Sequence, residues 1–366
     1  MTTMNILFDY QAFSMQRYGG ISRYFYEFIS RLCKEEEFAI SIFLGLYINE
    51  YGLAGYRHDY ARFCGVKHRH IPRTVRAFDI LNKLLFAPFL RASHANIYHQ
   101  TYYADVSGAF PGKRVLTVYD MIHELYPHYF LKRDQTSRNK KKSIQHADAI
   151  ICISEATKKD LVRLCGVPKE RIRVIYLGNS LAPSHESRSL IGTPYILYVG
   201  DRGAHKNFSL LRETYTATRH INSTYSLVCF GGGAFSREER SILRSEGLEQ
   251  KVLFIPGNDQ LLANIYQHAA VFVYPSLYEG FGIPPLEAMS CGCAVLASNT
   301  SSIPEVVGNA GGYFDPTSRD DLAFQLNRIL RDDSFRNELI ARGYEQEKKF
   351  SWDRCAKETM LLYQQV

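Results

Sequence analysis

The stretch VFVYPSLYEGFGIPPLEAMSCGC, residues 271–293, decides the fold expected for this chain. Its first four residues, Val271–Tyr274, form an apolar, β-branched and aromatic run that is typical of a buried parallel strand. Pro284 and Pro285 then open a helix, because proline is tolerated in a first turn whose N–H groups have no partner. We expect Glu287 in that first turn and Gly292 just beyond the helix end. The stretch therefore predicts a strand, a loop and a helix of an α/β sheet.

The loop between this strand and helix carries Glu279 and two glycines, Gly280 and Gly282, which flank Phe281. Glycines let the backbone approach a ligand closely, and a helix N-terminus offers unpaired N–H groups to an anion such as phosphate. A carboxylate in the helix, Glu287, would repel phosphate and is better suited to sugar hydroxyls. A tight turn whose glutamate complements the helix dipole has the same spacing, so spacing alone leaves both interpretations open.

The segments YEGFGIP at 278–284 and LEAM at 286–289 resemble the two-glutamate signature of the family-four retaining glycosyltransferases. The resemblance continues through Gly292 and through SIPEV at 302–306, departs at Ala294, where the family usually has proline, and is weaker in the N-terminal half. It implies the GT-B fold, an α/β architecture of two facing Rossmann-like domains with parallel sheets. In that fold a C-terminal helix crosses back to the N-terminal domain.

The expected domains follow from this resemblance and from one polar stretch. Residues 178–193, GNSLAPSHESRSLIGT, have no periodicity and are typical of a linker, which we place at 181–193. Residues 1–180 would then bind the acceptor and residues 194–350 the nucleotide sugar. The crossing helix would be 351–366, with Trp352 as an anchor.

Composition and charge narrow the class of protein. The chain has 366 residues, 46% of them hydrophobic, and no run approaches the roughly 20 apolar residues of a membrane span. Its start, MTTMNILFDY, lacks the shape of a signal peptide, and its eight cysteines form no CxxC pair, which favours a cytoplasmic protein. Cys291 and Cys293 have no second pair to complete a metal site. Residues 1–180 carry 26 Lys and Arg against 16 Asp and Glu, a net +10, so we expect an anionic partner for that half.

Two turns of the chain are further candidates for contact with a diphosphate. Gly19 and Gly20 lead into a helix predicted from residue 21 to 32, and in the family this turn faces the donor diphosphate. After a buried strand at 195–199, Arg202 and Lys206 lie on a glycine-containing turn, at the positions where the family places its phosphate-binding Arg and Lys. An ordinary surface loop explains the two cations without the resemblance.

A second glycine turn, Gly231 to Gly233, follows the strand predicted at 226–230. It would let the backbone approach a ribose or phosphate, or would serve only to turn the chain. We list Gly231 with Gly280, Phe281, Gly282, Ile283 and Glu287 as donor-binding candidates.

On the acceptor side, the predicted strand 114–119 ends at Asp120 and His123, where α/β sheets bind ligands. The family often has His-Asp here; Tyr119 stands in place of that His, so roles for Asp120 and His123 stay open, and His123 is equally explained as a helix N-terminal residue. The basic run at 132–142 is typical of a solvated helix face.

Residues 57–91 interleave eight Lys and Arg with apolar side chains. The favoured interpretation is a core-facing helix with a solvated basic side. Contact with an anionic membrane surface is the alternative, and a nucleic-acid patch lacks any recognised binding module.

The resemblance implies a retaining hexosyltransferase that needs no metal and no cofactor beyond its donor. Arg202, Lys206 and the amides around Gly282 would stabilise the leaving diphosphate, Glu279 would position the donor sugar, and Glu287 would hold ribose hydroxyls. The rivals are an epimerase or hydrolase of the same fold and a non-catalytic nucleotide-sugar-binding protein. GDP-mannose is the preferred donor over a UDP or dTDP sugar. A glycan or lipid-diphosphate-linked acceptor of bacterial O-antigen assembly, at the inner face of the inner membrane, is the expected partner.

Overall fold

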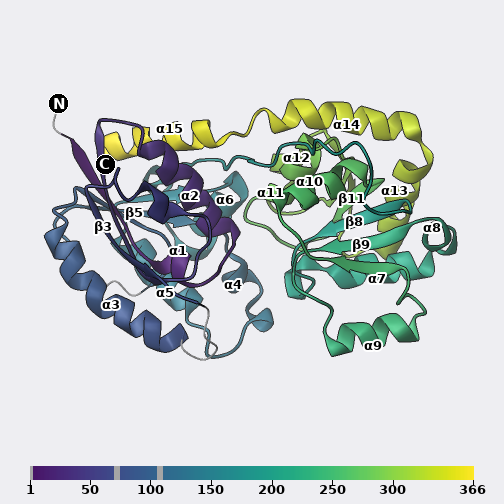
Figure 1. The fold of residues 1–366 in the computed structure, drawn as a ribbon, viewed down its shortest axis with the longest axis horizontal. Coiled ribbons are helices and arrows are strands. Elements are labelled where there is room, and N and C mark those ends of the chain that lie inside the picture. Colours follow the sequence, from purple (N-terminus) through teal and green to yellow (C-terminus); the bar gives the residue numbers. More distant parts are fainter. Residues whose placement is uncertain (1–2, 70–74, 105–109) are drawn as a thin grey trace. The chain divides into compact units, whose positions relative to one another are not determined.

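The computed structural model describes residues 3–69, 75–104 and 110–366. The chain divides into two compact units, the first made of residues 1–178 and 351–366 and the second of residues 179–350 (Figure 1). Each unit is an α/β structure built on one parallel sheet. Among the described residues, none of the helices is both long and apolar enough to cross a bilayer.

The first unit contains a seven-stranded sheet in the order β3-β2-β1-β4-β5-β6-β7. Its strands are β1 (Met4–Phe8), β2 (Phe38–Tyr47), β3 (Arg62–Lys67), β4 (Ile97–Gln100), β5 (Lys113–Val118), β6 (Ala149–Cys152) and β7 (Ile172–Val174). Its helices are α1 (Gln11–Ser14), α2 (Gly20–Leu32), α3 (Val75–Ala92), α4 (Ile122–Leu125), α5 (Thr136–His146), α6 (Glu155–Cys165) and α15 (Trp352–Gln365).

Alternate residues of the central strands of this sheet pack against different helices. Phe8 and His99 contact Phe25 of α2, and His99 Nδ1 lies 2.5 Å from the hydroxyl of Tyr363 in α15. Their strand neighbours Leu7 and Tyr98 instead pack with α3. Because successive side chains of a strand point to opposite faces, α2 and α15 cover one face and α3 the other.

The second unit contains a six-stranded sheet in the order β10-β9-β8-β11-β12-β13. Its strands are β8 (Tyr195–Val199), β9 (Ser226–Phe230), β10 (Val252–Ile255), β11 (Val271–Tyr274), β12 (Val295–Ser298) and β13 (Gly311–Phe314). Its helices are α7 (Phe208–Ala217), α8 (Arg219–Thr224), α9 (Arg237–Ser245), α10 (Asp259–His268), α11 (Ile283–Ser290), α12 (Ile303–Val307), α13 (Arg319–Arg331) and α14 (Asp333–Glu347).

Several sequence predictions need correction in detail. The last strand of the first unit was expected at 174–176 but is Ile172–Val174. The proline-rich helix begins at Ile283, one residue before Pro284, so Glu287 is its fifth residue and lies outside the first turn. The chain from Asn179 onward belongs to the second unit and has no helix or strand before Tyr195. The roles assigned to the two units stay predictions.

The C-terminal helix α15 completes the first unit, as the expected crossing requires. Ser351 caps it by accepting a hydrogen bond from the backbone N–H of Arg354. Trp352 is buried and its ring lies 6.3 Å from that of Tyr24 in α2. Gly178, the last residue before the chain enters the second unit, packs directly on this start of α15, where a Cβ would lie 2.2 Å from the backbone nitrogen of Trp352.

This contact predicts that Gly178→Ala will destabilise the protein. The added methyl meets backbone atoms, which cannot rotate away, so we expect the free energy of unfolding to fall by about 1–3 kcal/mol in urea titration. Gly192→Ala is the matched control, because nothing lies within 4 Å of its Cβ position. Equal stability of the two variants would contradict the packing described.

Candidate active site

The carboxyl ends of β8, β9 and β11 carry most of the residues predicted to bind the donor. The chain leaves β8, forms β9 and β10 on one side, and returns to β11 on the other side of β8. Open parallel sheets bind ligands at such a switch point, because the loops on either side of it turn away from each other. The loop after β8 holds Arg202 and Lys206, and the loop after β11 holds Glu279.

Lys206 and Glu279 form an ion pair across this switch point. The Lys206 ammonium lies 2.8 and 3.0 Å from the two carboxylate oxygens of Glu279, and the side chains are 25% and 12% exposed. Burial raises the pKa of Glu279, but the charge of Lys206 and hydrogen bonds from Lys206 and Ser276 outweigh it, so this pKa stands below its ordinary value. The Glu279 carboxylate is therefore charged at neutral pH.

Hydrogen bonds from neighbouring loops fix both ends of the pair. Asn207, in a left-handed conformation with φ +54°, donates its side-chain amide to the carbonyls of Pro275 and Pro316. The Ser301 hydroxyl accepts the backbone N–H of Glu279, and the Ser302 hydroxyl donates to the carbonyls of Glu279 and Phe281. These hydrogen bonds hold the backbone of the two loops that carry Lys206 and Glu279.

The glycine loop ahead of α11 bends as the sequence predicted. Gly282 precedes the helix with φ +131°, a conformation that L side chains rarely adopt. Phe281 is buried against Phe350, at 5.7 Å between ring centroids. Gly280, Gly282 and Ile283 lie at or just before the helix N-terminus, and Glu287 is buried with the Tyr266 hydroxyl 3.4 Å from its carboxylate.

Arg202 lies differently from what its expected role requires. Its guanidinium donates to Glu239 at 2.7 Å and to the carbonyls of Gly231 and Gly233, and it stacks 4.7 Å from the ring centroid of Phe235. With a side chain only 5% exposed, Arg202 holds the glycine turn after β9. No local pattern around Arg202 signals its bond to Glu239, because Glu239 lies on α9, 37 residues away.

Gly231 and its neighbours adopt left-handed conformations, with φ between +68° and +78°. A Cβ on Gly232 would lie 2.5 Å from the carbonyl oxygen of Gly200, so this turn presses on the loop after β8. In the first unit, Gly19 precedes α2 in an extended conformation and Gly20 is its first residue. Gly19 and Gly20 stand at the start of a helix and Gly231 follows a strand, as predicted, while their contact with a phosphate stays a prediction.

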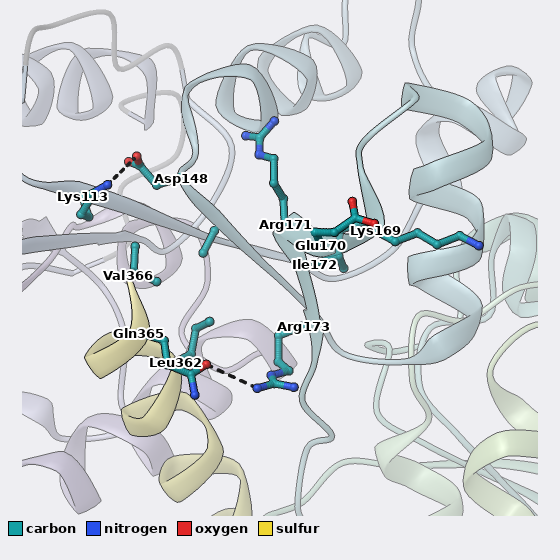
Figure 2. A pocket seen from close by; sticks show the side chains of 11 residues that line it. Lys113, Asp148, Lys169, Glu170, Arg171, Ile172, Arg173, Leu362, Gln365 and Val366 are labelled. Atoms are coloured by element: carbon teal, nitrogen blue, oxygen red, sulfur yellow. Dashed lines mark hydrogen bonds and ion pairs between the residues drawn. The ribbon is translucent and has the colours of Figure 1, made fainter.

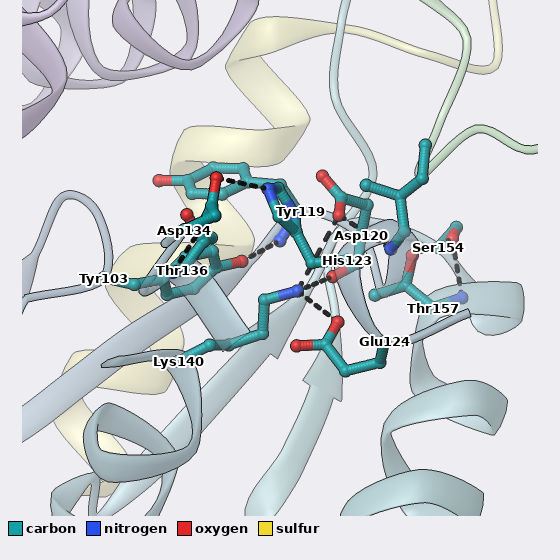
Figure 3. Close-up of polar contacts among 11 residues, drawn as sticks. Tyr103, Tyr119, Asp120, His123, Glu124, Asp134, Thr136, Lys140, Ser154 and Thr157 are labelled. Atoms are coloured by element: carbon teal, nitrogen blue, oxygen red, sulfur yellow. Dashed lines mark hydrogen bonds and ion pairs between the residues drawn. The ribbon is translucent and has the colours of Figure 1, made fainter. Parts of the chain in front are cut away.

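A second cluster surrounds Asp120 and His123 in the first unit (Figure 3). Asp120 accepts the backbone N–H of Ile122 at 3.0 Å. His123 stacks on Phe130, lies 3.9 Å from the Asp134 carboxylate, and its Nδ1 atom is buried without a hydrogen-bond partner in the described part of the chain. Burial lowers the pKa of His123 and outweighs the attraction of Asp120, so the ring is neutral at pH 7.

Lys140 corrects the prediction that the basic run 132–142 is solvated throughout. It is 1% exposed and donates to the Asp120 carbonyl at 2.8 Å and to the Glu124 carboxylate at 2.7 Å. Its ammonium also lies 5.1 Å from the centroid of the Tyr103 ring. Figure 3 shows this ammonium between Asp120 and Glu124, where it ties α5 to the loop after β5.

Tyr119, which stands where the family often has histidine, is buried and donates its hydroxyl to the Thr101 carbonyl at 2.7 Å. Asp9, at the end of β1, is fully buried and accepts hydrogen bonds from Tyr98, Thr101 and Gln11. Burial raises the pKa of Asp9 despite these bonds. Both residues stabilise the loop after β4.

A pocket of about 650 Å³ lies elsewhere in the first unit, beside the start of β5, β7 and the end of α15 (Figure 2). Its lining mixes Lys113, Lys169, Arg171 and Arg173 with Asp148 and Glu170. None of the residues predicted to bind donor or acceptor lines it.

Comparison with protein families covers nearly the whole chain. The family model described as Glycosyl transferases group 1 matches residues 185–346, and the model of Glycosyltransferase Family 4 matches residues 18–182. O-antigen chain mannosyltransferase B of Escherichia coli is 30% identical over 369 residues, covering 94% of this chain and 95% of that protein. Serotype-specific mannosyltransferase WbdA of Escherichia coli is 28% identical, but this chain spans only 37% of its length.

Two solved structures show the same fold at low sequence identity. Sucrose-phosphate synthase from Thermosynechococcus elongatus superimposes with a TM-score of 0.77 at 20% identity, over 99% of this chain and 98% of that one. HepE of Anabaena, in complex with UDP and glucose, superimposes with a TM-score of 0.77 at 16% identity, over 99% of this chain and 100% of that one. The expected fold class, with two parallel sheets and a C-terminal helix packed on α2, is confirmed.

The ion pair predicts that the free energy of unfolding depends differently on pH in the native chain and in the variant Lys206→Met. In the native chain the lowered pKa of Glu279 stabilises the fold above the ordinary carboxyl range, and this stability is lost as pH falls through the folded-state pKa. In Lys206→Met, only the Ser276 hydrogen bond and the His205 charge still oppose burial, so the pKa of Glu279 is higher than in the native chain and acidification from pH 7 should cost the variant less stability. We expect it to be about 1–3 kcal/mol less stable at pH 7. Urea titrations of the native chain and the variant from pH 7 to pH 4 measure the difference in stability and its dependence on pH. If the two free energies of unfolding change in parallel with pH, Lys206 does not set the pKa of Glu279.

Lys140 and its neighbour Lys141 form a matched pair for a second test. Lys140→Met leaves Glu124 without its cation and should lower the free energy of unfolding by about 2–4 kcal/mol. Lys141 is exposed, so Lys141→Met should change stability by less than about 0.5 kcal/mol. If the two variants have the same stability in thermal and urea unfolding, the buried contact of Lys140 with Glu124 does not stabilise the protein.

Proposed function

The chain belongs to the family-four retaining glycosyltransferases, and on this premise we propose that it transfers mannose from a nucleotide diphosphate sugar to a glycan or lipid-diphosphate-linked acceptor of bacterial O-antigen assembly. The observation that carries the proposal is the Lys206–Glu279 pair at the switch point of the second sheet. Two O-antigen chain mannosyltransferases among the relatives support the choice of sugar and product. The inner face of the inner membrane is the proposed place of the reaction.

The donor diphosphate would approach the ion pair and the glycine loop together. Its negative charge would draw the Lys206 ammonium away from Glu279, because a phosphate offers more charge than one carboxylate. Glu279 would then be free to accept hydrogen bonds from hydroxyls of the donor sugar. Glu287, a buried residue of α11, would hold the ribose. The pair seen here is thus proposed to be the resting state of a donor site.

Transfer would exchange one bond for another at the anomeric carbon. The bond from that carbon to the diphosphate oxygen breaks with its electron pair, and the acceptor oxygen attacks from the same face. The acceptor proton passes to the leaving phosphate oxygen, so no carboxylate nucleophile is needed. Lys206 and the amides before α11 would stabilise the charge that develops on the diphosphate. On the geometry described, Arg202 would contribute by holding the Gly231–Gly233 turn.

The acceptor is proposed to meet Asp120 and His123. The Asp120 carboxylate, 31% exposed, can accept a hydrogen bond from a sugar hydroxyl, and Phe130 stacked on the neutral His123 ring offers an apolar ring for the sugar face. Asp134 completes the set of polar groups. The residues are held in place by Lys140, which supports the loop that carries Asp120.

Lys206→Ala should lower turnover by about 10²-fold or more, since it removes a charge that acts on the leaving group. Lys348→Ala is the control, because that lysine is 64% exposed and pairs only with Glu345 among described acidic groups. Transfer is measured with radiolabelled GDP-mannose, UDP-glucose or dTDP sugars and a lipid-diphosphate-linked acceptor, after thermal-shift binding of GDP, UDP and dTDP identifies the base.

The outcomes separate the proposal from its rivals. Near-native transfer by Lys206→Ala would remove the assigned role. Rapid consumption of donor without acceptor would indicate a hydrolase or epimerase. Stabilisation by a nucleotide with no turnover toward any acceptor would indicate a binding protein.

A further inference from the structure

Helix α3 has two apolar faces, and only one of them is covered. Phe86 and Leu90 are buried in the core beneath the sheet, and the side chain of Asn82 is bonded to both backbone groups of Leu46 in β2. A Cβ on Gly45 would lie 2.3 Å from the Asn82 amide oxygen, so helix and strand are in close contact there. These contacts fix which side of α3 faces the protein.

The opposite side of α3 presents a stripe of large apolar side chains to solvent. It consists of Ile80, Leu81, Leu84 and Leu85, exposed by 59%, 42%, 68% and 47%. At about 100° per residue these four positions fall within about 140° of the helix circumference, so their side chains form one stripe. Surface helices normally carry charged side chains on their outer face, and an exposed apolar stripe marks an interaction site. The exposed side of α3 therefore carries large apolar side chains beside the cations that the sequence predicted there.

Cations border this leucine stripe. Lys83 and Arg91 are exposed on α3 itself, and Asp79, the acidic residue of the helix, is paired with Lys83 at 3.1 Å. Strand β3 and the residue after it run along the flank of α3: the Arg62 guanidinium lies 5.7 Å from the Phe89 ring, and the His68 ring 4.5 Å from that of Phe78. Arg62 is exposed at this flank, whereas Lys67 is paired with Glu50 and is not counted among these cations.

We propose that the leucine stripe of α3 with its bordering cations is a docking surface for an anionic phospholipid bilayer. Leucine side chains would enter the boundary between headgroups and acyl chains while Lys and Arg bind the phosphates. Charge selects this occupant over a second copy of the chain, because residues 57–91 carry eight Lys and Arg against two Asp and Glu. A symmetric dimer would bring these like charges together. The proposal is independent of the reaction, since it needs neither donor nor acceptor.

The test uses the full chain and vesicles without any glycosyl acceptor. We expect the native protein to float with vesicles of phosphatidylcholine and phosphatidylglycerol, to bind vesicles of pure phosphatidylcholine at least several-fold more weakly, and to lose binding as salt rises. Leu84→Glu should reduce the partition coefficient at least about tenfold, because it removes the most exposed leucine of the stripe from the membrane.

Leu190→Glu is the matched control, since Leu190 is 64% exposed but lies in the second unit, outside any helix or strand. It adds the same charge and should leave binding unchanged. Equal binding by the native chain and Leu84→Glu would overturn the proposal, as would an equal loss in both variants. A native dimer that Leu84→Glu converts to a monomer, measured by light scattering, would assign the stripe to a second copy instead. Circular dichroism checks that both variants fold.

Discussion

The charge pair between Lys206 and Glu279 is the interaction on which the candidate site depends. Two opposite charges, both largely removed from water, belong to loops that follow neighbouring parallel strands. Each charge would be costly to bury alone, so the two loops are stable only in a mutual arrangement. Asn207, Ser301 and Ser302 then lock the backbone around the pair. The backbone of the site is ordered before any ligand binds, so a donor would have to separate the two charges but not rebuild the loops.

In both sheets a buried polar contact lies where the order of the strands reverses. In the second unit the order of strands reverses between β8 and β11, and the ion pair lies there. In the first unit the reversal lies between β1 and β4, where Asp9 and Thr101 are bonded. Asp120 lies one strand further along, after β5. At each point where the strand order reverses, a buried polar contact therefore holds the two neighbouring loops together: Asp9 with Thr101 in the first unit and Lys206 with Glu279 in the second.

The sequence predicted the helices and strands well, because these depend on neighbouring residues. The glycines around Phe281 and the strand before them have local signatures, and both were predicted in place. Burial and partner choice depend on distant residues. In the sequence Lys140 cannot be told from the five other cations of its run. Only the fold shows that it is buried and paired with Glu124. Arg202 matches a phosphate-binding position, yet its contacts with Glu239 and Phe235 come from α9 and the turn before it. Periodicity likewise finds the apolar residues of α3 without showing that half of them stay uncovered.

The return of α15 to the first unit has a consequence for biosynthesis. His99 in the central strand β4 bonds Tyr363, and Trp352 packs on α2, so this unit lacks part of its core until the last residues exist. The second unit, residues 179–350, is continuous and can complete its core as soon as it leaves the ribosome. At translation rates of about 5–20 residues per second, the nascent N-terminal half waits roughly 10–40 s after Gly178 is made. During that interval the apolar surface that α15 covers is exposed, so a chain that ends before α15 has a complete sheet with part of one face uncovered and prone to aggregation.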